Sequence, residues 1–90
     1  MAIHLTYRAE VFEEDGQFVA LCPELNVSSY GDNVEEARKS LREAMDLFLE
    51  ECETMGTLEV VLREAGFSPE PLNPRKWISR LPILVEQVSL

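Results

Sequence analysis

The residues with the most chemical potential in this chain lie between Val19 and Ala37, in the stretch VALCPELNVSSYGDNVEEA. A cysteine nucleophile needs a base within hydrogen-bond reach and a third group that orients the base. The only histidine is His4, and Cys22 shares its strand face with Phe18 and Ala20. This alternation predicts a buried, unreactive thiol. We therefore expect no enzyme here; a cysteine enzyme would require Cys22 to be exposed and reactive.

The same stretch offers little to a metal or a phosphate group. Two isolated cysteines and one histidine lack the ligand spacing of a zinc site. Asp32, Glu35 and Glu36 carry the oxygens that Mg²⁺ prefers. Adjacent glutamates on a helix, however, diverge by about 100°, and acids in a first turn are expected for helix capping. A phosphate would meet the wrong charge in YGDNVEE. We expect no metal and no cofactor.

The acidic residues are unevenly distributed along the chain. The formal net charge is −9, and residues 1–56 hold 13 acids and 4 bases, whereas residues 57–90 hold 4 of each. An acidic surface repels phosphate backbones, so we expect no direct nucleic-acid binding. It would suit a basic protein partner, because complementary potentials steer association. Simple solubility explains the same charge equally directly, and both interpretations stay open.

Three strands are predicted before residue 31. Residues 3–12 alternate between apolar and polar side chains, which is typical of a half-buried strand. Residues 13–16 end in Asp-Gly and predict a hairpin turn. Residues 17–22 are apolar on both faces, which favours a central strand that Pro23 ends. Residues 27–30 are a short third strand.

A long helix is predicted over residues 34–54. Asn33 is a good N-cap, and Glu36 stands at the capping-box position. One apolar stripe and three pairs of opposite charge spaced four residues apart support the helix. The stripe is Ala37, Leu41, Ala44, Met45, Phe48 and Cys52, and the pairs are Glu35–Lys39, Lys39–Glu43 and Arg42–Asp46.

The far end of this helix is acidic, where the helix dipole favours cations. The acids are Asp46, Glu50, Glu51 and Glu53. Either the bases Arg75, Lys76 and Arg80 offset them, or a basic partner does.

Beyond Gly56, Thr57 can cap a shorter helix over 58–65 that Gly66 stops. Residues 68–74 contain three prolines and predict an extended connection. Trp77 is expected in the core, and residues 81–88 are expected to form a last strand beside the first. The predicted fold class is α+β, with two layers in the antiparallel order β-β-β-α-(α)-β.

Ninety residues are enough for one small domain, 1–90, whose limited core favours a homo-oligomer. No apolar run is long enough to span a membrane, and the first ten residues lack a basic leader followed by an apolar stretch. Two unpaired cysteines fit a reducing compartment. These features predict a cytoplasmic protein without membrane contact.

The span from Asp15 to Glu50 resembles the N-terminal domain of HicB-family antitoxins from type II toxin–antitoxin systems. The match is dense over residues 5–51 and loose over the last strand. Asn33 stands where the family commonly has threonine, and no DNA-binding domain is evident. The matching residues are Gly16, Phe18, Cys22-Pro23-Glu24-Leu25, Gly31-Asp32, Glu36-Ala37, Leu41, Glu43-Ala44 and Phe48-Leu49-Glu50.

The resemblance implies a partial RNase H-like fold without the nuclease's metal-binding acids. It also implies a non-catalytic antitoxin that binds a HicA-type toxin, a small basic protein that cleaves mRNA. The charge distribution leads us to expect acidic contacts with such a partner. The alternative is an orphan homo-oligomeric interaction domain with no toxin. The candidate contact residues are Glu24, Asp32, Glu35, Glu36, Asp46, Glu50 and Glu51.

Overall fold

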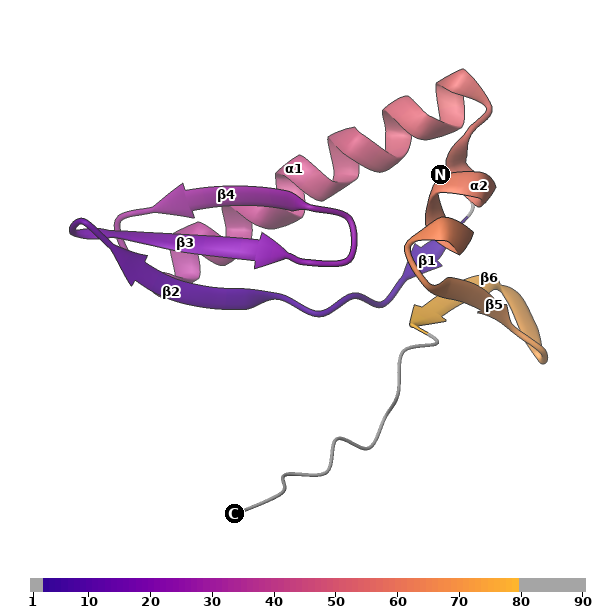
Figure 1. The fold of residues 1–90 in the computed structure, drawn as a ribbon, viewed down its shortest axis with the longest axis horizontal. Coiled ribbons are helices and arrows are strands. Elements are labelled where there is room, and N and C mark those ends of the chain that lie inside the picture. The colour runs from indigo at the N-terminus through magenta and orange to yellow at the C-terminus, as the bar shows by residue number, and fades with distance from the viewer. Residues whose placement is uncertain (1–2, 80–90) are drawn as a thin grey trace, which may run out of the picture.

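The computed structural model describes residues 3–79 as a mixed α+β structure with two helices and two three-stranded sheets (Figure 1). One sheet has the strand order β2-β3-β4, and the other has the order β1-β6-β5. The elements are β1 His4–Leu5, β2 Glu10–Glu14, β3 Gln17–Cys22, β4 Val27–Gly31, α1 Val34–Met55, α2 Leu58–Glu64, β5 Phe67–Glu70 and β6 Asn73–Ser79.

The first sheet is an antiparallel meander with β3 at its centre, as its apolar residues on both faces predict. Asp15 and Gly16 form the two-residue turn between β2 and β3, with φ of 50° and 82°. Positive φ at both positions is the geometry of the hairpin turn that Asp-Gly favours. The β3–β4 connection closes where the amide of Asn26 donates to the carbonyl of Pro23 at 3.3 Å.

The predicted single strand over 3–12 is wrong, because the chain divides there between two pairings. β1 pairs in parallel with β6, whereas β2 pairs antiparallel with β3. Residues 6–9 between them belong to no strand, although the amide of Thr6 still donates to the carbonyl of Trp77 at 3.0 Å. The expected single sheet is therefore two sheets joined by residues 3–14.

The predicted connection over 68–74 is also wrong, because β5 and β6 form a hairpin there. The prolines signal a loop locally, but an edge strand tolerates Pro69, and Pro74 stands near the start of β6. Pro69 lies in β5, the edge strand, beside a register shift, and Pro71 lies between the strands. The strand beside β1 is thus β6; the predicted strand 81–88 lies outside the described residues.

Helix α1 begins where the sequence predicts and ends within one residue of the expected position. The amide of Glu36 donates to Asn33 Oδ1 at 2.8 Å, which is the expected N-cap bond. Gly56 ends the helix in the left-handed conformation, with φ of 74°. The buried stripe is Ala37, Leu41, Met45, Leu49 and Cys52, while Ala44 and Phe48 are half-buried.

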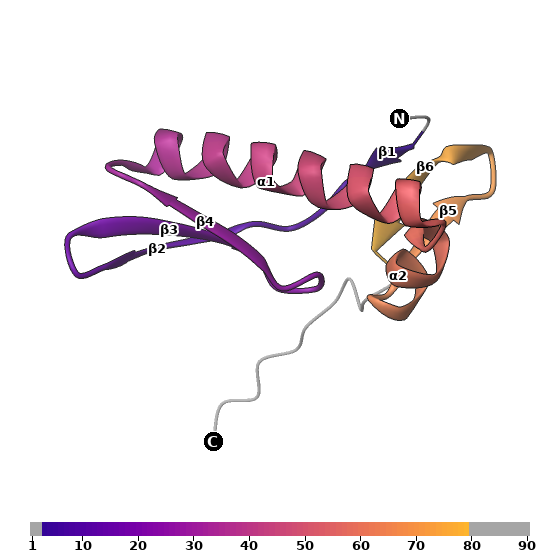
Figure 2. The same cartoon turned by 90° about the horizontal axis from the view of Figure 1, so that it is seen from above.

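Helix α1 covers one face of the β2-β3-β4 sheet (Figure 2). Its first turn lies so close to Gly31 that a Cβ there would come within 2.7 Å of the Ala37 amide nitrogen. Only glycine avoids this clash with backbone atoms. The strand-to-helix junction is therefore tightly packed.

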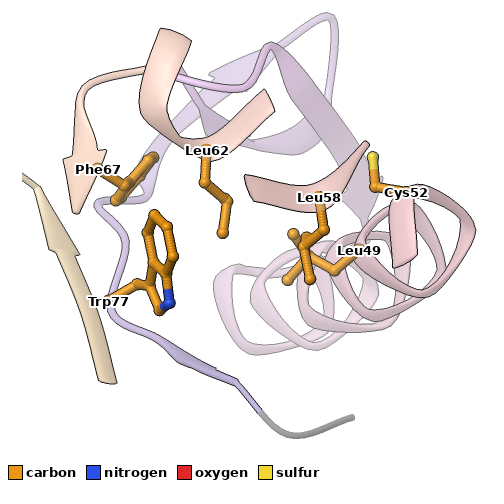
Figure 3. Packing of buried hydrophobic residues seen from close by; sticks show 6 residues of the cluster. All are labelled: Leu49, Cys52, Leu58, Leu62, Phe67 and Trp77. Carbon is orange, nitrogen blue, oxygen red and sulfur yellow. The ribbon is translucent and has the colours of Figure 1, made fainter. Parts of the chain in front are cut away.

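Two hydrophobic clusters hold the described residues together. One lies between α1 and the first sheet and contains Ala20, Cys22, Ala37, Leu41 and Met45. The other joins the end of α1, α2 and the second sheet, and contains Leu49, Cys52, Leu58, Leu62, Phe67 and Trp77 (Figure 3). Trp77 is buried in it, as predicted. Neither described helix is long and apolar enough to cross a membrane.

Candidate protein-binding surface

Cys22 ends β3 in the core, and its surroundings are those of a structural thiol. Its side chain is fully buried, and the thiol donates to Glu24 Oε2 at 3.9 Å rather than to an imidazole. Burial raises the pKa of Cys22 above its ordinary value. The thiol therefore stays protonated near neutral pH, which makes it a poor nucleophile.

Glu24 is held within the molecule, unlike the other predicted contact residues. Its side chain is only 5% exposed, and one carboxylate oxygen lies 3.3 Å from Arg8 Nε. This ion pair ties the β3–β4 connection to the segment that follows β1. Since its carboxylate already has a cationic partner, Glu24 is poorly placed to bind a second protein.

Asp32, Glu35 and Glu36 are exposed where β4 meets α1. The pairing of Phe18 with Gly31 brings the tip of the β2–β3 hairpin to the same end of the molecule. Figures 1 and 2 both show this hairpin tip and the start of α1 at one end. We call this region the acidic end, and its residues are Glu13, Glu14, Asp15, Asp32, Glu35 and Glu36.

All six side chains of the acidic end are exposed, and none forms an ion pair within residues 3–79. The predicted pair between Glu35 and Lys39 does not form within 4.0 Å. The first-turn position still favours Glu35 and Glu36, because the helix N-terminus carries partial positive charge. The acidic end nonetheless keeps negative charge that no side chain within residues 3–79 neutralises through an ion pair.

Asp46, Glu50 and Glu51 lie along the second half of α1, and all three are exposed. Glu35 and Glu51 are 16 residues apart, about 24 Å along a helix. The seven predicted residues thus fall into three separate places and do not form one site.

The acids at the far end of α1 have no ion pair with Arg75 or Lys76. Lys76 instead lies 3.8 Å from Glu70, and the last turn of α1 has no basic residue. The predicted Lys39–Glu43 and Arg42–Asp46 pairs are likewise absent among the described ion pairs. Arg80 lies outside the described residues.

A hollow of about 360 Å³ is lined by the first described residues of the chain and by α1. Tyr7 lines this hollow. Burial raises the pKa of its phenol, which therefore stays neutral near neutral pH. Within residues 3–79, no three histidine, cysteine or acidic side chains are grouped to hold a metal ion. The hollow is lined by Ile3, His4, Leu5, Tyr7, Arg42, Met45, Asp46 and Leu49.

Glu13, Glu14 and Asp15 belong to the acidic end, although the sequence predicts only a hairpin turn for them. The pairings of β3 with β2 and with β4 bring them to the same end of the sheet as Asp32. The signal was present in part, since an Asp-Gly turn next to a short third strand predicts this neighbourhood.

Comparisons with models of protein families, with curated proteins and with solved structures find no match to this chain.

Proposed function

We propose that this chain is a non-catalytic, antitoxin-like protein that binds and neutralises a small basic toxin of the HicA type. The acidic end is its main contact surface. The observation that carries the proposal is the gathering of six exposed acids from two chain segments, with no ion pair to any of them within residues 3–79.

Electrostatics explains why such a surface favours a basic partner. Like charges held at one end repel one another, and the repulsion decreases when cations approach. Complementary charges also steer the encounter and raise the association rate. Arginine side chains can bind carboxylates through two parallel hydrogen bonds, which adds directional specificity.

The element order supports the HicB-like assignment within this proposal. Four strands precede the long helix α1, with β1 and β2 in place of the single first strand that the resemblance implies, and β6 returns parallel to β1. That order accords with the partial RNase H-like fold implied by the sequence resemblance. The division into two sheets and the added α2 and β5 distinguish this chain from the simplest form of that fold.

The test is co-expression of the chain with the product of each flanking gene, followed by calorimetric titration at 50 and 300 mM NaCl. We expect a small basic product to bind more tightly at 50 mM. The variant Glu14→Lys/Asp32→Lys should weaken binding by about tenfold, since each substitution reverses a contact charge.

The matched control is Glu53→Lys/Glu59→Lys, which makes the same change in net charge at exposed positions of α1 and α2. It should retain most of the affinity. No complex at 50 mM NaCl with either product, or equal losses in the two variants, would contradict the proposal.

A homo-oligomeric interaction domain is the second candidate, and the strand edges favour it. Within residues 3–79, β2 and β4 each pair along one edge only. Such edges can add a strand from another copy. Light scattering during size-exclusion chromatography should then give at least twice the monomer mass, and a monomer at 100 µM would argue against this candidate.

A further inference from the structure

The face of the β2-β3-β4 sheet turned away from α1 carries a row of apolar side chains. Phe12 pairs with Val19, and Val19 pairs with Tyr30, so the three side chains are cross-strand neighbours. Phe12 is 43% exposed and Tyr30 is 64% exposed, although both are large and aromatic. We call Phe12, Val19, Leu21 and Tyr30 the outer row.

The alternation of the strands places these residues opposite α1. Val11, Phe18 and Ala20 pack in the cluster beneath α1, so their neighbours Phe12 and Val19 point the other way. No element within residues 3–79 lies on that outer face (Figure 2). Strand β3 is thus apolar on both faces, whereas the described elements cover only one of them.

The outer row lies beside the acidic end. Phe12 directly precedes the acids of the hairpin, and Tyr30 stands two residues before Asp32. Glu14 alternates with Phe12 and shares its face of the sheet, as does Glu10, which is paired with Arg8 at 3.6 Å. We call Glu14 and the other acids of the acidic end the rim of the outer row. Aromatic rings next to carboxylates form a surface suited to arginine, because the guanidinium stacks on a ring while its N–H groups bind carboxylates.

The same charges disfavour a second copy as the occupant. Two chains meeting through this face would bring the acids of one rim toward the acids of the other. Like charges held opposite one another are destabilising. A partner with arginines around an apolar patch would instead contact both the rings and the rim.

We infer that the outer row is the apolar anchor of the interface, on which an arginine-bearing patch of the basic partner docks. This inference rests on the proposed function and deepens it, since it assigns the partner's apolar and guanidinium contacts to Phe12, Val19, Leu21 and Tyr30. The acids of the rim then position the arginines over the rings. Aromatic side chains near the centre of an interface commonly dominate its binding energy.

The test uses the complex with the basic flanking product and compares Phe12→Ser/Tyr30→Ser with Leu47→Ser. Leu47 is 68% exposed on α1, so it is a matched apolar control away from the sheet. We expect the double variant to lose at least about tenfold in affinity at both 50 and 300 mM NaCl. The control should change affinity less than twofold.

Thermal unfolding by circular dichroism checks that the variants fold, which is expected because the replaced side chains are exposed. If the double variant does not fold, Tyr30→Ser alone makes the same test. Unchanged affinity of the outer-row variants, with the wild-type complex intact, overturns the inference and leaves the proposed function standing. A wild-type chain that binds neither flanking product overturns both.

Two further measurements identify a competing occupant. A free dimer that Tyr30→Ser converts to a monomer would assign the face to a second copy. Nuclear Overhauser contacts between the methyl groups of Val19 and Leu84 in the free, monomeric chain would assign it to the chain's own C-terminal segment. Either result overturns the inference.

Discussion

Cys22 and Tyr7 pack in or against the cluster beneath α1. Burial is the largest influence on both groups, and it raises the pKa of each above its ordinary value. Both side chains are therefore neutral in the folded protein up to a higher pH than in the unfolded chain. The thiol and the phenol therefore change the free energy of unfolding in the same direction, because each keeps its proton to a higher pH in the folded protein than in the unfolded chain.

The free energy of unfolding should fall as the pH rises above about 9. The ordinary pKa values are 9.0 for cysteine and 10.0 for tyrosine. Above them the unfolded chain releases protons that the folded chain retains, so alkaline pH favours unfolding. Urea titrations from pH 7 to pH 10.5 should show a decline that is smaller in Cys22→Ala/Tyr7→Phe.

Tyr30→Phe is the matched control, because it alters an exposed phenol. It should leave the decline unchanged. A wild-type stability that is constant or rises across this pH range would contradict the prediction.

Helix α1 is the element that connects the two halves of the described structure. Its N-terminus is fixed by the Asn33 cap, and its buried stripe contributes to both hydrophobic clusters. The cap bond satisfies one of the amides that a helix start leaves without an intrahelical partner. Loss of the cap should therefore affect the whole fold.

Asn33→Ala should lower the free energy of unfolding by about 1 kcal/mol, since the Glu36 amide loses its side-chain acceptor. Asn33→Ser keeps an acceptor at this position and should lose clearly less. Urea unfolding followed by circular dichroism measures both variants. Equal stability of the alanine variant and the wild type would show that the cap does not contribute.

Helix α1 was predictable because its signals are local: a cap residue, a stripe of helical spacing and a terminal glycine. The break after Leu5 was not, because it depends on β6, whose partner residue Trp77 lies 72 positions away. The β5–β6 hairpin was missed for a related reason. Pro69 and Pro71 indicate a loop, but Pro69 is accommodated in β5 at a sheet edge and Pro71 in the turn between β5 and β6.

The candidate surface was predictable in the same limited way. Asp32, Glu35 and Glu36 follow one another in sequence and were identified together. Glu24 was also expected to be available, but its partner Arg8 lies 16 residues away in the chain. Residue type alone cannot show which carboxylates a folded chain neutralises, since that depends on contacts between distant segments.

At the scale of the whole molecule, charge is segregated along the chain. The net charge of −9 resides in residues 1–56, and the acidic end concentrates part of it around one hairpin tip and one helix start. Repulsion among those groups opposes the compact state. Dissolved salt screens such repulsion over a distance of about 10 Å at 0.1 M.

We therefore expect the free energy of unfolding to increase by about 0.5 to 1 kcal/mol between 10 and 200 mM NaCl. Urea unfolding at each salt concentration measures the change. In Glu14→Gln/Asp32→Asn the increase should be smaller, because two of the repelling charges are gone. A decrease in wild-type stability over this range would mean that attractive ion pairs dominate instead.

The chain's only tryptophan gives the molecule a localised optical reporter. Trp77 is packed in the cluster of α2 and the second sheet, with Arg63 5.1 Å from its ring centre, and Figure 2 places this region at the opposite end from the hairpin tip. Its emission therefore senses α2 and β6, and a ligand at the acidic end cannot quench it by contact. Any change in emission on binding would have to pass through the molecule. Leu5, Tyr7 and Leu25 pack against both clusters and, together with the buried stripe of α1, connect them.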